Sequence, residues 1–157
     1  MKYIKLFILV VIVNTNLSTY AQQAKDDTKQ LEDLVNSISE GVNMRNHSMI
    51  LNAFMHPSAL IYSTYEGVSG GGHSIKSNTA QGLADFIKDS NDIIKQQFDS
   101  VKIERIFNGR AVVTTYYYVT INGKKSHKGE EFYSAVKTKK GWKFISLMFT
   151  LEAWKDE

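Results

Sequence analysis

Residues 101–151 read VKIERIFNGRAVVTTYYYVTINGKKSHKGEEFYSAVKTKKGWKFISLMFTL, which is a series of four apolar segments separated by three turn sequences. The turns are Asn108-Gly109, Asn122-Gly123 and Lys139-Lys140-Gly141. Asn-Gly is a strong short-range signal for a β-hairpin, because both residues tolerate the positive φ of a type I′ turn. The region therefore predicts a meander of long antiparallel strands.

These predicted strands are apolar on both faces. In the segment 111–121, one side-chain parity carries Val113, Thr115, Tyr117, Val119 and Ile121, and the other carries Val112, Thr114, Tyr116, Tyr118 and Thr120. An antiparallel sheet with one solvated face would alternate apolar with polar residues. We therefore expect both faces of this sheet to be covered.

Upstream of the meander, the sequence predicts two helices. After a polar, frayed start at 22–30, apolar residues recur at helical spacing over 31–42, with Asp26 or Asp27 available as a cap. A shorter helix is expected over 47–54.

The next part of the chain predicts a strand, a loop and a third helix. The strand covers 59–65, and the glycine-rich residues 66–74 are predicted as a loop. Ser77-Asn78-Thr79 can cap a helix whose apolar face carries Leu83, Phe86 and Ile87. Residues 89–97 fit either the end of this helix or a linker.

The first 21 residues have the pattern of a cleaved secretory signal peptide. Lys2 and Lys5 form a basic start, 6–13 form an apolar core, and small residues lead to Ala21. Read as a membrane anchor, the apolar core is too short to span about 30 Å of hydrocarbon. We therefore expect cleavage after Ala21, a periplasmic or secreted location without membrane attachment, and one domain over 22–157.

The composition limits the kind of membrane anchor and the classes of partner that the protein can have. The chain has no cysteine, which excludes disulfides and lipid-anchored export. It has 19 Lys and Arg against 16 Asp and Glu, so loss of Lys2 and Lys5 with the leader leaves a net charge of +1. Nucleic-acid binding needs a basic face across the whole domain, and the lysines here cluster at hairpin ends. No nucleic-acid partner is expected.

No motif identifies a cofactor, a metal or a catalytic residue. Residues 67–74 match a phosphate-binding loop in their glycines, but His73 stands where a lysine is required. The histidines at 47, 56, 73 and 127 show no metal-ligand spacing, although a zinc site assembled from distant residues stays open. No serine lies in a Gly-x-Ser-x-Gly context.

Glu130 and Glu131 form an adjacent carboxylate pair near the centre of the predicted sheet. Neighbours in a strand point to opposite faces, so at most one of the two is expected to be buried. A buried carboxyl would have a raised pKa.

The order of the predicted elements, together with four short segments, resembles the NTF2-like superfamily, an α+β fold also called cystatin-like. The segments are Phe54–Ala59, Ala111–Val113, Gly129–Phe132 and Gly141–Ile145. Within the superfamily, the chain is most similar to small bacterial SnoaL-like and lumazine-binding-like proteins, over about residues 28–152. Members often have an acidic residue where this chain has Ser58.

The resemblance implies a cone, in which a strongly bent antiparallel sheet of long strands wraps around about three helices and leaves a pocket. It also implies a homodimer through the outer face of the sheet, where Tyr116, Tyr118, Phe144 and Met148 are expected. The residues that it places toward the pocket are Ile61, Ser63, Tyr65, Thr115, Tyr117, Val119, Leu147 and Phe149.

Ketosteroid isomerase chemistry is not implied, because the catalytic positions of that branch align with Ser63, Ser39 and residues 132–134, and none of these can serve. An apolar pocket with a few hydroxyls and no evident base favours binding of a small apolar or aromatic molecule. Tyr117, Ser63 and Tyr65 are expected to hold its polar end. A SnoaL-like enzyme (isomerase, cyclase or dehydratase) acting through hydroxyl and histidine groups stays open, as does a filled cone that acts as a dimeric interaction module.

Overall fold

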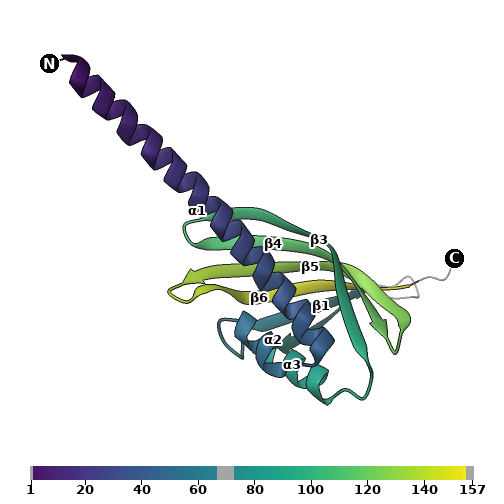
Figure 1. Cartoon of the computed structure of the whole chain (residues 1–157). Coiled ribbons are helices and arrows are strands. Elements are labelled where there is room, and N and C mark those ends of the chain that lie inside the picture. The colour runs from purple at the N-terminus through teal and green to yellow at the C-terminus, as the bar shows by residue number, and fades with distance from the viewer. Residues whose placement is uncertain (1, 67–72, 155–157) are drawn as a thin grey trace.

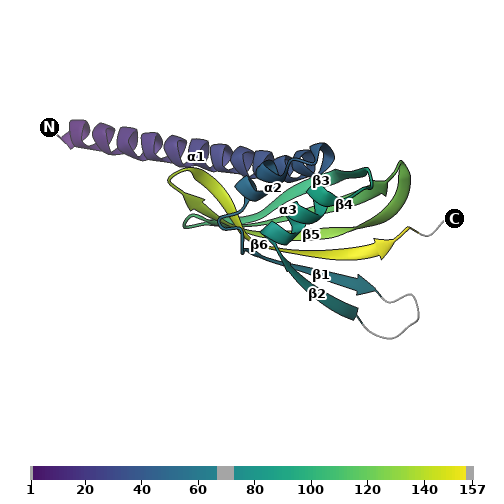
Figure 2. The ribbon, with the colours of Figure 1, turned by 90° about the horizontal axis from the view of Figure 1, so that it is seen from below.

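The structure is a computed structural model that describes the backbone of residues 2–66 and 73–154 and the side chains of residues 22–65 and 74–154. Within this part, three helices lie on one face of a six-stranded sheet with strand order β2-β1-β6-β5-β4-β3 (Figures 1 and 2). The helices are α1 (Lys2–Met44), α2 (His47–Ala53) and α3 (Ala80–Asp89). The strands are β1 (Leu60–Glu66), β2 (His73–Thr79), β3 (Ile94–Phe107), β4 (Arg110–Ile121), β5 (Lys124–Thr138) and β6 (Gly141–Ala153). The predicted α+β cone is confirmed.

Strands β3 to β6 form the meander, and they reverse at the predicted turns. Asn108 and Gly109 have φ angles of 47° and 68°, and Asn122 and Gly123 have 54° and 78°. Two consecutive positive φ angles are the mark of a type I′ turn. Gly141, with φ of 100°, opens β6 in a conformation that costs glycine no steric energy.

Four register shifts bend the long strands. Two interrupt the pairing of β3 with β4, one that of β4 with β5, and one that of β5 with β6. A bulge adds a residue to one strand, bends that strand and increases its local twist. Figure 2 shows β3, β4 and β5 curling toward the side that the helices occupy. The curl encloses space between the sheet and the helices.

The shift between β5 and β6 also changes which residues of β6 face inward. Ile145 is an additional residue at this point, so Phe144 and Leu147, three positions apart, are both buried. The ring of Phe144 lies 4.3 Å from that of Tyr133, centroid to centroid. The prediction of Phe144 on the outer face is wrong, because simple alternation does not reveal a bulge. Met148, the other β6 residue expected on the outer face, is 45% exposed.

The first half of the chain adds two strands to the meander. β1 pairs antiparallel with β2 and parallel with β6, so the sheet is mixed rather than wholly antiparallel. The sequence does not predict β2, and the loop predicted over 66–74 overlaps its start; residues 67–72 lie outside the described residues. β2 is polar, and its strand conformation comes from pairing with β1 rather than from local propensity.

The third helix begins where the sequence predicts. The Thr79 side chain accepts a hydrogen bond from the Gly82 N–H at 3.1 Å, which caps α3. α3 ends at Asp89 and β3 begins at Ile94. The ambiguous residues 89–97 therefore divide into a short connection and the start of a strand.

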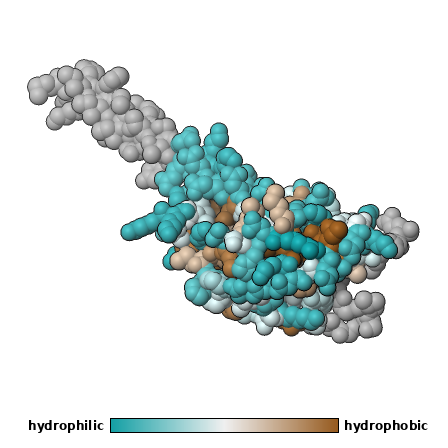
Figure 3. Space-filling model, turned by 60° about the horizontal axis from the view of Figure 1, so that its bottom comes forward, coloured by the Kyte–Doolittle hydropathy of each residue, from teal (hydrophilic) through white to brown (hydrophobic). Residues whose placement is uncertain are grey.

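One face of α1 packs into the cone. Its residues Leu31, Val35, Ile38 and Val42 recur at helical spacing and are buried. The frayed start predicted over 22–30 is wrong, because these residues are part of α1. The surface seen in Figure 3 is mainly hydrophilic, with apolar side chains in small areas. Over the residues that the structure describes, no helix has a segment long and apolar enough to cross a membrane.

Asp27 anchors α1 to the sheet instead of capping a helix. Its side chain is buried, and its Oδ1 accepts hydrogen bonds from Trp142 Nε1 at 3.0 Å and from Lys137 Nζ at 2.5 Å. Both partners lie at the turn between β5 and β6. The carboxylate was expected as a helix cap because the sequence shows no sign of a partner more than a hundred residues away.

Candidate functional site

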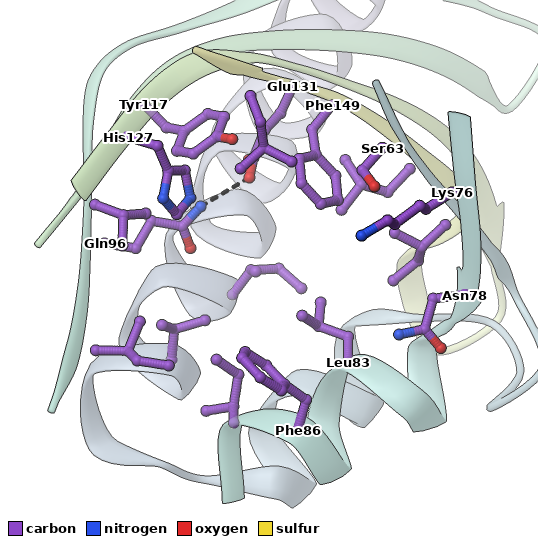
Figure 4. A pocket seen from close by; sticks show the side chains of 18 of the residues that line it. Ser63, Lys76, Asn78, Leu83, Phe86, Gln96, Tyr117, His127, Glu131 and Phe149 are labelled. Atoms are coloured by element: carbon purple, nitrogen blue, oxygen red, sulfur yellow. Dashed lines mark hydrogen bonds between the residues drawn. The ribbon is translucent and has the colours of Figure 1, made fainter. Parts of the chain in front are cut away.

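A cavity of about 390 Å³ lies between the helices and the inner face of the sheet (Figure 4). Small-molecule sites are roughly 300–1,000 Å³ in volume. Its lining comes from α1, α3 and all six strands. The apolar lining residues are Ile38, Val42, Ile61, Leu83, Phe86, Ile87, Ile94, Val119, Ile121, Leu147, Phe149 and Leu151. The polar ones are Ser63, Tyr65, Lys76, Ser77, Asn78, Gln96, Tyr117, His127 and Glu131.

Most of the residues that were predicted to face a pocket line this cavity. They are Ile61, Ser63, Tyr65, Tyr117, Val119, Leu147 and Phe149. Thr115 is the exception, since it is buried and its hydroxyl donates to Glu131. Alternation along β1 and β4 accounts for this agreement, because successive side chains of a strand point to opposite faces.

The wall of the cavity holds a buried carboxyl group. Glu131 of β5 is 4% exposed, whereas Glu130 is exposed, as expected for neighbours on a strand. Gln96 Nε2 donates to Glu131 Oε1 at 2.7 Å. Thr115 Oγ1 donates to Oε2 at 3.2 Å, and the Tyr133 hydroxyl donates to the same oxygen in a short hydrogen bond. The prediction that the pocket contains no evident base is therefore wrong.

Two opposing effects set the pKa of Glu131. Burial disfavours the ionised form, and the hydrogen bonds from Tyr133, Gln96 and Thr115 favour it. Burial is the larger effect and raises the pKa from 4.5 to about 7. Burial also raises the pKa of Tyr133 well above its usual value, so its hydroxyl stays protonated and can donate. The site thus has a carboxyl that exchanges a proton near neutral pH.

Helix α1 holds one of the three donors to this carboxyl, Gln96, in place. The backbone carbonyl of Gln96 accepts hydrogen bonds from Ser39 Oγ at 2.8 Å and from Asn43 Nδ2 at 2.9 Å. The Gln96 N–H donates to Asn43 Oδ1 at 2.8 Å. With both backbone groups bound to the helix, the Gln96 amide is directed at Glu131 (Figure 4).

Tyr117 points into the cone, but its hydroxyl already has a partner. It donates to the backbone carbonyl of Thr150 at 2.7 Å. Gly129 of β5 makes room for the Thr150 carbonyl group that accepts this hydrogen bond, since a Cβ at position 129 would lie 2.1 Å from the carbonyl oxygen. Burial raises the pKa of Tyr117 far above its usual range. The expectation that Tyr117 joins Ser63 and Tyr65 in holding a ligand is revised, because its proton is used within the fold.

His127 lies beside Tyr117 at the margin of the cavity. Its ring stands edge-on to that of Tyr117 at 6.0 Å, and its Nδ1 is 3.0 Å from Ser126 Oγ. Burial lowers the pKa of His127, so the ring is neutral at neutral pH.

The other histidines lie away from the cavity or outside the described side chains. His56 Nδ1 is 2.7 Å from Ser58 Oγ in the turn before β1, and His47 Nε2 is 3.0 Å from Asp85 Oδ1 between α2 and α3. The side chain of His73 is not among those described. Within the part of the chain that the structure describes, no three His, Asp or Glu residues are grouped so as to hold a metal ion.

Edge strand β2 presents polar residues to the cavity. Lys76 and Asn78 face it from β2, and Glu131 faces it from β5, three strands away in the sheet (Figure 4). Lys76 pairs with Ser63 across β1 and β2, and its ammonium lies 4.8 Å from the centroid of the Tyr65 ring. Ile75, which precedes Lys76 on β2, points the other way and is 70% exposed.

Sequence reasoning did not assign Gln96, Lys76 or His127 to the pocket, and it expected burial of at most one of Glu130 and Glu131 without deciding which. Alternation could not decide between the two glutamates, because both parities of β5 carry apolar residues, Tyr133 on one and Phe132 on the other. No signal existed for Lys76, since β2 was not predicted, or for Gln96, which lies in the ambiguous residues 89–97.

No protein-family model matches the chain, and no curated protein matches it in sequence. Solved structures do match. An NTF2-like protein with a cystatin-like fold from Novosphingobium aromaticivorans superposes with a TM-score of 0.66 at 11% identity, over 87% of this chain and 88% of that one. A protein from Novosphingobium aromaticivorans, provisionally assigned as the beta subunit of an aromatic-ring-hydroxylating dioxygenase, gives 0.66 at 13% identity, over 88% and 95%. A provisionally assigned dehydratase of the NTF2-like family from Streptomyces avermitilis gives 0.62 at 12% identity, over 83% and 99%.

These matches confirm the predicted fold. At such low identity, the likeness concerns the fold and carries no activity from one protein to another. The finer resemblance to SnoaL-like and lumazine-binding-like proteins stays a prediction.

Proposed function

We propose that this chain, which has the NTF2-like fold, binds one small, largely apolar or aromatic molecule in the cavity of its cone. The observation that carries the proposal is the cavity itself, whose lining is aliphatic and aromatic apart from a few convergent polar groups. Such a lining is typical of small-molecule sites. A cavity of about 390 Å³ supports this reading over a cone filled by its own side chains.

The arrangement of the lining supports one orientation of the bound molecule. Its apolar body would rest between Leu83 and Phe86 of α3 and Phe149 of β6, which face one another across the cavity (Figure 4). A hydroxyl or amine of the molecule would meet Glu131, which can accept a hydrogen bond when ionised and donate one when protonated. Gln96 is already bonded to Glu131 and would keep that carboxyl in position.

The test is a fluorescence titration with N-phenyl-1-naphthylamine, a neutral aromatic probe. We expect saturable binding to the native protein, and at least tenfold weaker binding to Leu83→Trp, whose larger side chain occupies the cavity. Met55→Trp is the matched control, because Met55 is exposed and does not line the cavity. Absence of saturable binding, or equal binding by the two tryptophan variants, would overturn the proposal.

A second candidate, a proton-transfer enzyme, is favoured by one specific observation. Glu131 faces the cavity and burial raises its pKa to about 7, which suits a general base at neutral pH. The carboxylate would remove a proton from a carbon next to a carbonyl group, and the electron pair would pass to the carbonyl oxygen. Exchange of the α-protons of 2-tetralone in D₂O, followed by NMR, would test this. The native protein should accelerate the exchange and Glu131→Gln should not; equal rates would reject the candidate.

The homodimer also remains a proposal. Its support is a set of exposed apolar side chains on the outer face, namely Leu60 of β1, Ile145 and Met148 of β6 and Val112 of β4. A second copy would present the same face and cover it by two-fold symmetry. Sedimentation should give twice the mass of the mature chain, and Met148→Lys should give the single mass. A native protein that sediments as a monomer at micromolar concentration would exclude the dimer.

Export of the domain is proposed on the basis of the leader sequence. The first part of α1 extends well beyond the sheet (Figures 1 and 2), and the anchor at Asp27 lies after the expected cleavage point at Ala21. Cleavage would therefore leave the anchor with the domain. N-terminal sequencing of the protein from a cell-envelope fraction should begin at Gln22, and an intact Met1 would exclude cleavage.

A further inference from the structure

Edge strand β2 carries an arrangement that stability alone does not favour. Lys76 points into the cavity and Ile75 points to solvent, although burying the isoleucine would remove more apolar surface from water. A shift of β2 by one residue against β1 would exchange the two orientations. The observed register instead pairs Lys76 with Ser63, another residue that lines the cavity.

The cavity consequently has a carboxyl group and an ammonium group in separate parts of its lining. Glu131 lies in the wall formed by β4 and β5, and Lys76 lies at the β2 rim (Figure 4). Among the described side chains, Lys76 is in no ion pair, and the ring of Tyr65 is its cation–π partner. A cation at the mouth of an apolar cavity attracts anions more strongly than one on an open surface, because low-dielectric walls weaken its screening.

We propose that the molecule bound in this cavity is an amphiphilic anion, with a ring-containing apolar body and one carboxylate or sulfonate group that pairs with Lys76. The assignment rests on the proposed function, since it names the class of molecule that the same cavity takes. Asn78 is placed beside Lys76 and its amide can donate a hydrogen bond to the same anionic group (Figure 4). The anion stays partly solvated at the rim, and the body extends inward over Phe149.

A competing explanation for Lys76 is protection of the sheet edge, because inward-pointing charges on edge strands discourage pairing with other chains. The two explanations predict different results. Edge protection alone leaves ligand affinity independent of the lysine. Anion pairing makes affinity for charged molecules, and not for neutral ones, depend on it.

The experiment compares two fluorescent probes that share one aromatic skeleton. 8-Anilinonaphthalene-1-sulfonate carries a sulfonate, and N-phenyl-1-naphthylamine is the same molecule without it. Both are titrated into the native protein and into Lys76→Met, Lys76→Arg and Lys139→Met, the last being a charge-matched control at the β5–β6 turn. Thermal unfolding followed by circular dichroism checks that each variant is folded.

We expect Lys76→Met to raise the Kd of the sulfonate probe about tenfold and to change the Kd of the neutral probe less than twofold. Lys76→Arg and Lys139→Met should leave both values near those of the native protein. Raising the salt concentration should weaken binding of the sulfonate probe to the native protein but not to Lys76→Met.

The possible failures are distinguishable. If neither probe binds the native protein saturably, or if Leu83→Trp does not weaken them, the proposed function fails and this inference fails with it. If both probes bind in the cavity but Lys76→Met affects them equally or not at all, the cavity still binds small molecules and the anion assignment is overturned. If Lys76→Met does not fold, salt-independent binding of the sulfonate probe to the native protein overturns it instead.

Discussion

Glu131 and Lys76 face the same cavity from environments that differ in almost every respect. Glu131 lies on a central strand, is buried, and has hydrogen-bond donors on both of its oxygens. Lys76 lies on an edge strand, is exposed, and rests against one aromatic ring. A buried charge is coupled to the stability of the fold, whereas an exposed charge keeps its water and is coupled mainly to what approaches it. In this one pocket, the wall residue Glu131 is therefore expected to affect mainly the stability of the fold, and the rim residue Lys76 mainly the choice of ligand.

The largest effect that would sharpen this contrast is expected from Glu131→Ala. The substitution leaves the donors of Gln96, Thr115 and Tyr133 without their acceptor and enlarges the cavity, so the free energy of unfolding should fall by about 4 kcal/mol. Urea unfolding measures it. Glu130→Ala, on the exposed neighbour, is the matched control and should change stability by less than about 0.5 kcal/mol. Similar losses in both variants would remove the distinction between a buried and an exposed carboxylate.

The second effect is the pH dependence that Glu131 gives to stability. Burial raises its pKa from 4.5 to about 7, so between these values the folded protein holds a proton that the unfolded chain releases. The free energy of unfolding therefore falls by about 3 kcal/mol as the pH rises through this window. Above the window it is level.

Comparison with Glu131→Gln isolates this contribution, because glutamine does not titrate. The unfolding free energy of the native protein, minus that of the variant, should fall by about 3 kcal/mol between pH 4.5 and pH 7.5. A difference that is constant, or that grows with pH, would show that the carboxyl is not perturbed upward.

A smaller effect is expected from Tyr117→Phe, elsewhere in the wall. The variant loses one hydrogen bond and leaves the Thr150 carbonyl without that donor, so stability should fall by about 1–2 kcal/mol. Affinity for the neutral probe should stay within twofold. A tenfold loss of affinity without a loss of stability would instead support the sequence-based expectation that this hydroxyl holds the ligand.

The smallest effect on stability is expected at the rim. Lys76→Met removes an exposed charge and a cation–π contact, and the unfolding free energy should change by less than about 0.5 kcal/mol. Thermal unfolding at fixed pH checks this. A loss of 2 kcal/mol or more would show that Lys76 at the rim, like Glu131 in the wall, contributes to the stability of the fold.

Much of the fold could be predicted from short segments of sequence. The Asn-Gly pairs located the hairpins, and alternation along β4 placed Tyr117 and Val119 on the inner face. These features depend on preferences within a few residues. The candidate site was predicted only in part, because alternation identifies the face of a residue but not its partners.

By itself, then, the sequence determined where the strands turn, which parity of β1 and β4 faces inward, and which face of α1 is apolar. Tertiary structure alone decided that Phe144 is buried, that β2 joins the sheet with Lys76 inside, and that Glu131 is buried with Gln96 as its donor. The physical reason is the range of the interactions. Turn geometry and alternation are set by local backbone preferences. Bulges and the burial of a carboxyl depend on pairings between distant segments, such as Gln96 with Glu131 and Asp27 with Lys137.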